Sequence, residues 1–226
     1  MKGKYVALII VLILLLDQGL KIWIKTSYPT GEVMHVFGQS WFRLHFIENS
    51  GMAWGWKLGN SIGKLVLTLF RLVAVIWGTF YLKDIVRKKY TTGFIVCAAL
   101  IYAGAAGNLI DSMFYGLIFD KGWHFDPALN DYVGYAGVAH FSSHGYASFF
   151  HGSVVDMLYW PIIENGTFPS WIPFVGGQNF TFFNFICNVA DVSISVGVIV
   201  LLLWQKKFLP KKEIPAPSSN VQEKED

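Results

Sequence analysis

Four aspartates of this sequence stand in or beside long apolar runs: Asp17, Asp111, Asp156 and Asp191. Two of them follow an asparagine by three residues, since Asn108 precedes Asp111 and Asn188 precedes Asp191. On a helix, residues three apart share a face, so each amide can hydrogen-bond its carboxylate and fix its orientation. Two carboxylates a few Å apart cannot both ionise. Such a pair can hydrolyse a peptide bond, because the ionised acid takes a proton from water while the protonated acid polarises the carbonyl.

The composition indicates what kind of element must position these acids. Of the 226 residues, 54% are hydrophobic and only 15% are charged, whereas a typical soluble domain is about 25% charged. This excludes a water-soluble globule, and the apolar content also excludes a disordered chain. The net charge of +3 is too small to indicate nucleic-acid binding, and two cysteines cannot form a disulfide framework. The composition is typical of an integral membrane protein.

Four stretches approach the length and apolarity that a bilayer-spanning helix requires, about 20 residues. They are residues 5–24, 62–82, 93–113 and 184–204. The sequence therefore predicts an all-α membrane protein with four transmembrane helices and a small extracytoplasmic β-element. We expect a single domain over residues 1–209, with a long outer loop at about 116–151. The Lys/Glu/Pro/Ser-rich residues 210–226 are predicted to be a disordered tail.

Lys and Arg are distributed unequally between the segments that join the spans. If both termini face the cytoplasm, the inner segments hold 11 of the 18 Lys and Arg and the outer segments hold 4. The positive-inside rule therefore predicts cytoplasmic termini. In that orientation Asp17, Asp111 and Asp191 all lie within about 10 Å of the outer boundary, and Asp156 lies in the adjoining outer segment. Four separate stretches thus bring a carboxylate to one depth on one side.

Other interpretations remain open at this point. In one alternative, the Asn–Asp pairs serve solely to join helices by hydrogen bonds, as in a non-enzymatic assembly factor. Intramembrane acids also line the pathways of transporters and proton-coupled channels, but a pathway needs polar residues through the full depth, and the inner halves of the spans are apolar apart from Arg71. His140 and His144 lie in a Ser/Gly/Phe-rich stretch without a helical pattern, so a metal site there is disfavoured.

Five blocks of the sequence, taken in order, resemble those of the bacterial lipoprotein signal peptidases, the signal peptidase II family. The blocks are Asp17-Gln18 with Lys21, residues 49–55, residues 104–111, Val154-Val155-Asp156 and Asn188-Val189-Ala190-Asp191. The resemblance implies a membrane aspartyl endopeptidase of the bacterial inner membrane with its active site near the outer face. Such an enzyme removes the signal peptide from diacylglyceryl-modified prolipoproteins. It cuts before the lipidated cysteine and needs no cofactor.

The resemblance also implies roles for individual residues. Asp156 and Asp191 match the catalytic pair. Seven other residues match positions that shape or support the site: Asp17, Lys21, Asn49, Gly51, Asn108, Asp111 and Asn188. The implied partners are a diacylated prolipoprotein and membrane lipid. We expect a monomer and no nucleic-acid partner.

Three features depart from the family pattern. Ser112 stands where the family usually has arginine, Cys187 stands where an aromatic residue is common, and the stretch 116–151 is longer than usual. Arg71, well inside the second span, could supply the missing guanidinium, or it could snorkel or pair with any nearby acid. The long stretch could cover the site, select substrates, bind another envelope protein or be an inert insertion. The sequence does not choose between these alternatives.

Overall fold

The computed structural model of this chain describes residues 1–39, 41–50, 61–182 and 185–208. Four helices in it are long and apolar enough to span a membrane: α1 (Gly3–Ser27), α2 (Ser61–Arg87), the helix Thr92–Ile118 and α5 (Val189–Phe208). Each corresponds to one of the predicted spans, so the multi-pass membrane architecture is confirmed. The predicted tail at 210–226 and the predicted support residue Gly51 lie outside the described residues.

The third spanning helix consists of three parts. α3 (Thr92–Ile110) continues through a π-helical turn, Asp111–Tyr115, into the short α4 (Gly116–Ile118). Phe119 then takes an extended conformation and ends the helix. Asp111 is thus the first residue of the π-helical turn, a local widening of the helix that often occurs at functional sites.

The fourth spanning helix begins five residues later than the sequence predicted. Strand β8 (Ile186–Cys187) occupies the start of the predicted window. The backbone N–H of Asp191 donates to Asn188 Oδ1 at 2.9 Å, and the backbone N–H of Asn188 donates to Asp191 Oδ2 at 3.3 Å. These reciprocal contacts form a capping box, which fixes the first turn of α5. The Asn188–Asp191 spacing therefore starts a helix and does not mark a face within one.

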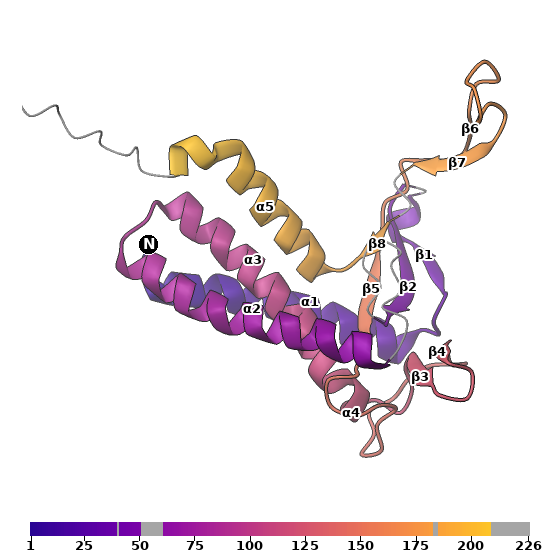
Figure 1. The fold of residues 1–226 in the computed structure, drawn as a ribbon, viewed down its shortest axis with the longest axis horizontal. Coiled ribbons are helices and arrows are strands. Elements are labelled where there is room, and N and C mark those ends of the chain that lie inside the picture. The colour runs from indigo at the N-terminus through magenta and orange to yellow at the C-terminus, as the bar shows by residue number, and fades with distance from the viewer. Residues whose placement is uncertain (40, 51–60, 183–184, 209–226) are drawn as a thin grey trace, which may run out of the picture.

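α3 lies at the centre of the bundle and packs against α1, α2 and α5 (Figure 1). Two of its glycines permit the close approach of the neighbouring helices. A Cβ atom on Gly104 would lie 2.2 Å from the backbone oxygen of Ala190, and one on Gly107 would lie 2.7 Å from Asp17 Oδ2. Small residues on α3 therefore allow α1 and α5 to approach it closely.

A four-stranded antiparallel sheet covers one end of the bundle (Figure 1). Its strands run in the order β1 (Val33–His35), β2 (Arg43–Asn49), β5 (Val154–Tyr159) and β8. All six residues of β5 are buried, which agrees with its apolar sequence. Asp156 is the one charged residue of that strand, and it pairs in register with Ile47 of β2. One of the two inner strands of the sheet, β5, thus carries a buried acid close to the helices.

The stretch 116–151 is built into the fold. It contains the hairpin of β3 (His124–Asp126) and β4 (Asp131–Val133), and an isolated bridge pairs Phe119 with Phe141. Phe119 and Ala139 are fully buried in a core that also contains residues of α1, β2 and β5. This stretch therefore contributes to the hydrophobic core and is anchored against α1 and the sheet.

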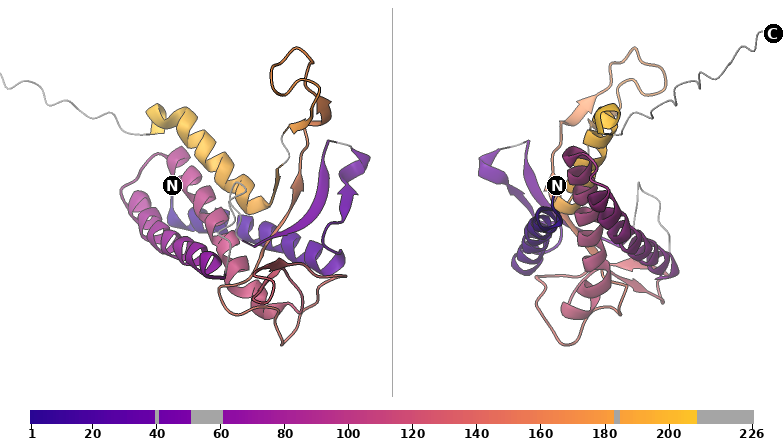
Figure 2. Two further views of the ribbon diagram at one scale, coloured as in Figure 1. Left: turned by 45° about the vertical axis from the view of Figure 1, so that its right-hand side comes forward. Right: turned by 90° about the vertical axis from the view of Figure 1, so that its left-hand side faces the viewer.

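A second hairpin, which the sequence analysis did not predict, connects β5 to β8. It consists of β6 (Ile163–Thr167) and β7 (Asn179–Phe182). Figure 1 and the left view of Figure 2 show it projecting away from the helices. The expected description as all-α with a small β-element is therefore correct only in part, because the extramembrane portion holds three separate sheets.

Candidate active site

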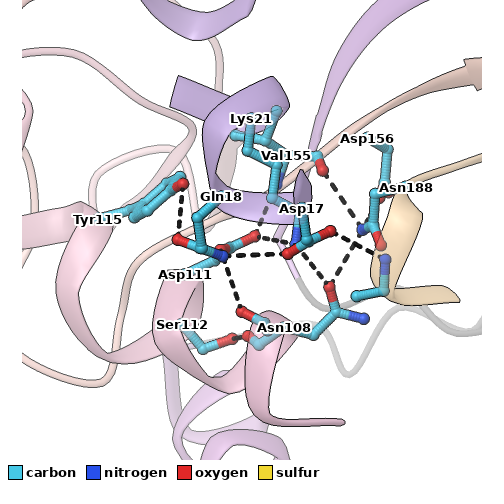
Figure 3. Close-up of polar contacts among 12 residues, drawn as sticks. Asp17, Gln18, Lys21, Asn108, Asp111, Ser112, Tyr115, Val155, Asp156 and Asn188 are labelled. Atoms are coloured by element: carbon cyan, nitrogen blue, oxygen red, sulfur yellow. Dashed lines mark hydrogen bonds and ion pairs between the residues drawn. The ribbon is translucent and has the colours of Figure 1, made fainter. Parts of the chain in front are cut away.

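Lys21 of α1 is the centre of a buried polar network (Figure 3). Its Nζ lies 2.8 Å from Asp17 Oδ2, 2.8 Å from Asp111 Oδ2 and 3.0 Å from Asn108 Oδ1. An ammonium group has three N–H donors, and these three oxygens accept all of them. Lys21, Asp17 and Asp111 are almost completely buried. Two of the four predicted acids therefore share one cation.

Asn108 of α3 connects this network to Asp191 of α5. Because the Lys21 ammonium can only donate, the amide oxygen of Asn108 must face it. The amide nitrogen of Asn108 consequently faces Asp191 and donates to its Oδ1 at 2.8 Å. The pairing Asn108–Asp111, expected from spacing along one helix, is therefore replaced by contacts between helices.

Asn188 contacts both of the acids predicted to be catalytic. Its Nδ2 donates to Asp156 Oδ1 at 2.6 Å, while its backbone N–H donates to Asp191 Oδ2 at 3.3 Å. The same Nδ2 lies 3.1 Å from Asn108 Oδ1. One residue at the start of α5 thus holds the carboxylate of β5 beside the carboxylate of α5.

Asp156 and Asp191 differ from the other two acids in their surroundings. Within the part of the chain that the structure describes, no Lys or Arg nitrogen lies within 4.0 Å of either carboxylate. Asp156 is buried and Asp191 is half-buried. Burial, and then the negative charge of Asp191, raise the pKa of Asp156 to about 8. The pair can therefore hold one proton at neutral pH.

Arg71 of α2 reaches the site at the position that the sequence analysis singled out. Its Nη1 donates to Ser112 Oγ at 2.9 Å, and Ser112 Oγ donates to the backbone oxygen of Asn108 at 2.9 Å. The guanidinium is close enough to Asp191, Asp111 and Asp156 to interact electrostatically with each of them. Arg71 therefore faces the bundle interior, in contact with the serine that stands where the family usually has arginine.

The other two predicted features of the site lie at its edge. Asn49 ends β2 and pairs in register with Val154, two residues before Asp156. Cys187, which stands where an aromatic residue is common, belongs to the sheet through β8 and is buried in the core. Burial, followed by the charges of Asp191 and Asp156, raises the pKa of the Cys187 thiol to about 12. Cys187 is therefore a neutral packing residue.

Gln18 and Tyr115 belong to the network, although the sequence analysis did not assign them to the site. Gln18 Nε2 donates to Asp111 Oδ1 at 2.8 Å and contacts Asp17 Oδ2 at 3.1 Å. The Tyr115 hydroxyl donates to Gln18 Oε1 at 3.1 Å, which orients the amide. Gln18 could have been assigned to the site from the sequence, because it adjoins Asp17. Tyr115 had none, because the π-helical turn that positions it is not visible in the pattern.

A buried ion pair between Lys25 and Glu48 was also missed. Lys25 Nζ donates to Glu48 Oε1. The rings of Phe119, Tyr135 and Tyr146 lie 5.1–5.2 Å from the same ammonium, as in cation–π contacts. Glu48 also accepts hydrogen bonds from the Tyr135 hydroxyl at 2.7 Å and from the backbone N–H of Trp123 at 2.9 Å. This pair fastens the stretch 116–151 to α1 and β2.

The site has the features that acid–base hydrolysis requires. Two carboxyl groups contact one asparagine, and amide N–H donors hold both of them in place. The described residues contain no group of three or more His, Cys, Asp or Glu arranged to hold a metal ion. The chemistry that this arrangement can perform with its own side chains is the addition of water to a carbonyl.

Comparisons with known proteins agree with this geometry. Residues 9–206 match the family model of signal peptidase (SPase) II. A lipoprotein signal peptidase of Porphyromonas gingivalis is 48% identical over 203 residues, covering 89% of this chain and 83% of that protein. The lipoprotein signal peptidase of Amoebophilus asiaticus is 31% identical over 198 residues, covering 86% and 75%. A solved bacterial membrane enzyme shares the fold at a TM-score of 0.55 and 23% identity, covering 95% of this chain and 96% of its own.

Proposed function

The chain belongs to the signal peptidase II family of membrane aspartic peptidases, which remove signal peptides from prolipoproteins, and we propose that Asp156 and Asp191 are its catalytic pair. The observation that carries this proposal is that Asn188 holds both carboxylates. Asp17 and Asp111 are the less suitable pair, because Lys21 neutralises part of their charge and occupies an oxygen of each.

The surroundings of the two acids support different roles for them. Asp156 is the more buried acid and has the raised pKa, so it holds the shared proton. Since Asp156 Oδ1 accepts from Asn188, that proton is on Oδ2. Asp191 is half-buried and accepts two hydrogen bonds, from Asn108 Nδ2 and the backbone N–H of Asn188, so both of its oxygens are held by donors and leave it to take the proton of water. Asp191 is therefore the base and Asp156 the acid.

The reaction then proceeds in two proton-balanced steps. Asp191 takes a proton from water as the hydroxide adds to the scissile carbonyl, and Asp156 gives its proton to the carbonyl oxygen. The tetrahedral intermediate collapses as Asp191 passes its proton to the leaving amine. Asp156 recovers a proton from the diol oxygen. Both acids return to their starting states without a covalent intermediate.

The proposed substrate is a prolipoprotein that already carries diacylglycerol on its cysteine. The signal helix enters from the side, through the bilayer, and its lipid chains stay in the acyl region. The scissile bond, directly before the lipidated cysteine, lies extended at the level of Asp156 and Asp191. Asn49 and Asn108 support the site from β2 and α3.

We further propose that Arg71 supplies the guanidinium group that the family usually has at the position of Ser112. The contact between Arg71 Nη1 and Ser112 Oγ brings a guanidinium to that position from another helix. Its charge acts on Asp191 and Asp156 from a distance, so it orients the site without forming an ion pair with either acid. Arg71 is thus a positioning residue.

The proposed orientation follows from the distribution of Lys and Arg. Both termini face the cytoplasm, the active site lies near the outer face of the inner membrane, and the enzyme acts as a monomer. Labelling of single introduced cysteines at residues 2 and 130 by a membrane-impermeant reagent tests the orientation. In intact spheroplasts, residue 130 should react and residue 2 should not, and the reverse result would invert the topology.

Incubation of the purified protein with a diacylated prolipoprotein tests the proposed activity. The same prolipoprotein without its lipid is the control. We expect cleavage of the lipidated substrate only, with product masses that locate the cut directly before the modified cysteine. Cleavage of both substrates would refute the lipid requirement, and cleavage of neither would refute the function.

A further inference from the structure

Lys64 is a buried lysine without an acidic partner among the described residues. It lies in the first described turn of α2 and is only 5% exposed. Lys21 and Lys25, the other buried lysines of the described chain, each contact a carboxylate. No carboxylate among the described residues lies within 4.0 Å of Lys64. Its Nζ instead donates to Ser153 Oγ at 2.9 Å and lies 5.4 Å from the centre of the Tyr132 ring. A buried charge of this kind is costly unless an opposite charge joins it.

The acid that acts most strongly on Lys64 is already engaged. Glu48 attracts it electrostatically, whereas Arg71 and Lys25 repel it. The carboxylate of Glu48 accepts from Lys25, Tyr135 and the backbone of Trp123. Three basic side chains, Lys25, Lys64 and Arg71, thus interact electrostatically, and Glu48 is hydrogen-bonded to Lys25. The local excess of positive charge favours an anion from outside the chain.

A cavity of about 300 Å³ opens beside Lys64, between α2, the β3–β4 hairpin and residues 146–151. We name it the Lys64 cavity. Its polar lining includes His124, Tyr132, Ser148 and His151. The Tyr132 hydroxyl is buried and has no hydrogen-bond partner among the described residues. Nδ1 of His124 contacts the backbone oxygen of Gly122, and Nδ1 of His151 contacts Ser148 Oγ and the backbone oxygen of Phe149. Several donors of different kinds therefore surround one space.

We propose that the Lys64 cavity binds a phosphate group, with the Lys64 ammonium as its counter-ion. A phosphate oxygen accepts charge-assisted hydrogen bonds from ammonium, hydroxyl and imidazole donors. A lipid headgroup and a free phosphate ion share this chemistry. Because Lys64 lies near one end of a membrane-spanning helix, the level of the phospholipid headgroups, the phosphate of an anionic phospholipid is the favoured source. This site is separate from the catalytic pair and does not depend on the proposed reaction.

Titration of the delipidated protein in maltoside detergent tests the proposal, with binding measured by native mass spectrometry and by thermal unfolding. The probes are phosphatidylglycerol, sodium phosphate against sodium chloride at equal ionic strength, and diacylglycerol as a lipid without phosphate. We expect phosphatidylglycerol to bind and to raise the unfolding temperature, and diacylglycerol to have no effect. An equal response to sodium phosphate would identify the free ion as sufficient.

Variants connect the binding to Lys64. Lys64→Met should weaken phosphatidylglycerol binding about tenfold or more, and Tyr132→Phe should weaken it by a smaller factor. Lys64→Arg keeps the charge and should retain binding. Lys89→Met removes an exposed lysine of equal charge and should leave binding unchanged. If Lys64→Met does not fold, the proposal is tested by Lys64→Arg and Tyr132→Phe, of which only Tyr132→Phe should bind phosphatidylglycerol more weakly than the unmodified protein does. Absence of binding to the unmodified protein, or undiminished binding to every variant that folds, would overturn the proposal.

Discussion

A single ammonium group sorts the four acids into two classes. The depth of the acids in the predicted spans could bring them together but could not choose a pair. Lys21 distinguishes the two pairs, because it contacts Asp17 and Asp111 directly. Among the described residues, no Lys or Arg nitrogen lies within 4.0 Å of Asp156 or Asp191. The charge of an acid in contact with a cation is partly neutralised, whereas two neighbouring acids without a cation can share a proton. The proposed division of labour therefore follows from local electrostatics.

The raised pKa of Asp156 predicts a pH limit for activity. Since the shared proton is held with a pKa of about 8, the rate should fall as the pH rises through about 8, approaching tenfold per pH unit above it. The pH–rate profile of kcat/KM measures this. A rate that keeps increasing beyond pH 9 would contradict it.

The same group also predicts how stability changes with pH. An unfolded Asp loses its proton near pH 3.9, so between about pH 4 and 8 the folded protein holds a proton that the unfolded chain does not. Stability should therefore fall as the pH rises through this window. Asp156→Asn should flatten that dependence, as measured by thermal unfolding.

The contact between Arg71 and Ser112 predicts that an arginine at position 112 can replace the arginine at position 71. Arg71→Ala should lower kcat by up to about 10²-fold, because the site loses an orienting charge. Adding Ser112→Arg to that variant should restore much of the rate, since the new guanidinium can occupy the space that Arg71 vacates. Arg87→Ala, at the exposed end of the same helix, is the matched control and should leave kcat unchanged. Unchanged turnover in Arg71→Ala would contradict the proposed positioning role of Arg71.

At the scale of elements, the start of α5 shows why sequence reasoning was only partly correct. Hydropathy predicted a span from residue 184 because apolar residues occur on both sides of Asn188. The hydrogen bonds of the capping box, and the pairing of β8 with β5, override that pattern. The motif Asn-x-x-Asp before an apolar run was itself a signal for a helix start. Reading it in that way would have placed Asp191 in the first turn.

The crossing of α3 and α5 predicts an unequal effect of two glycine substitutions. Gly104→Ala should destabilise the protein by about 1–3 kcal/mol, because its Cβ would lie 2.2 Å from the backbone of Ala190. It should also lower activity, since Ala190 adjoins Asp191. Gly19→Ala in α1 has no atom within 4 Å of the new Cβ and should be neutral or slightly stabilising. Thermal unfolding of both variants provides the comparison, and equal effects would argue against the close approach.

At the scale of the whole molecule, the helices and the presence of a β-element were predictable, whereas the way in which the extramembrane strands pair was not. Long apolar runs specify spanning helices locally, so the existence of all four was confirmed. The four-stranded sheet joins strands from residues 33 to 187, and such distant pairings leave no local pattern. The contacts of Lys25 with Glu48 and with the rings of Phe119, Tyr135 and Tyr146 were missed for the same reason. The site depends on both kinds of element, because Asp156 lies on the sheet and Asp191 on a helix.

The Lys25–Glu48 pair predicts that the stretch 116–151 is held firmly. Glu48→Gln would leave the Lys25 ammonium buried without its partner, which typically costs about 3–5 kcal/mol. We expect a lower unfolding temperature and faster proteolysis within residues 116–151. Asp84→Asn disrupts an exposed ion pair on α2 and should change little. Unaltered proteolysis in Glu48→Gln would mean that other contacts anchor this stretch.

The central claim is that Asp156 and Asp191 act together as the acid and the base, and the cleavage rates of Asp156→Asn and Asp191→Asn test it most directly. Each substitution should lower the rate on a diacylated prolipoprotein by at least about 10²–10⁴-fold, while the unfolding temperature shows that the variant remains folded. Asp84→Asn serves as the control for the loss of an acid elsewhere. Near-normal cleavage by either folded variant would contradict the account.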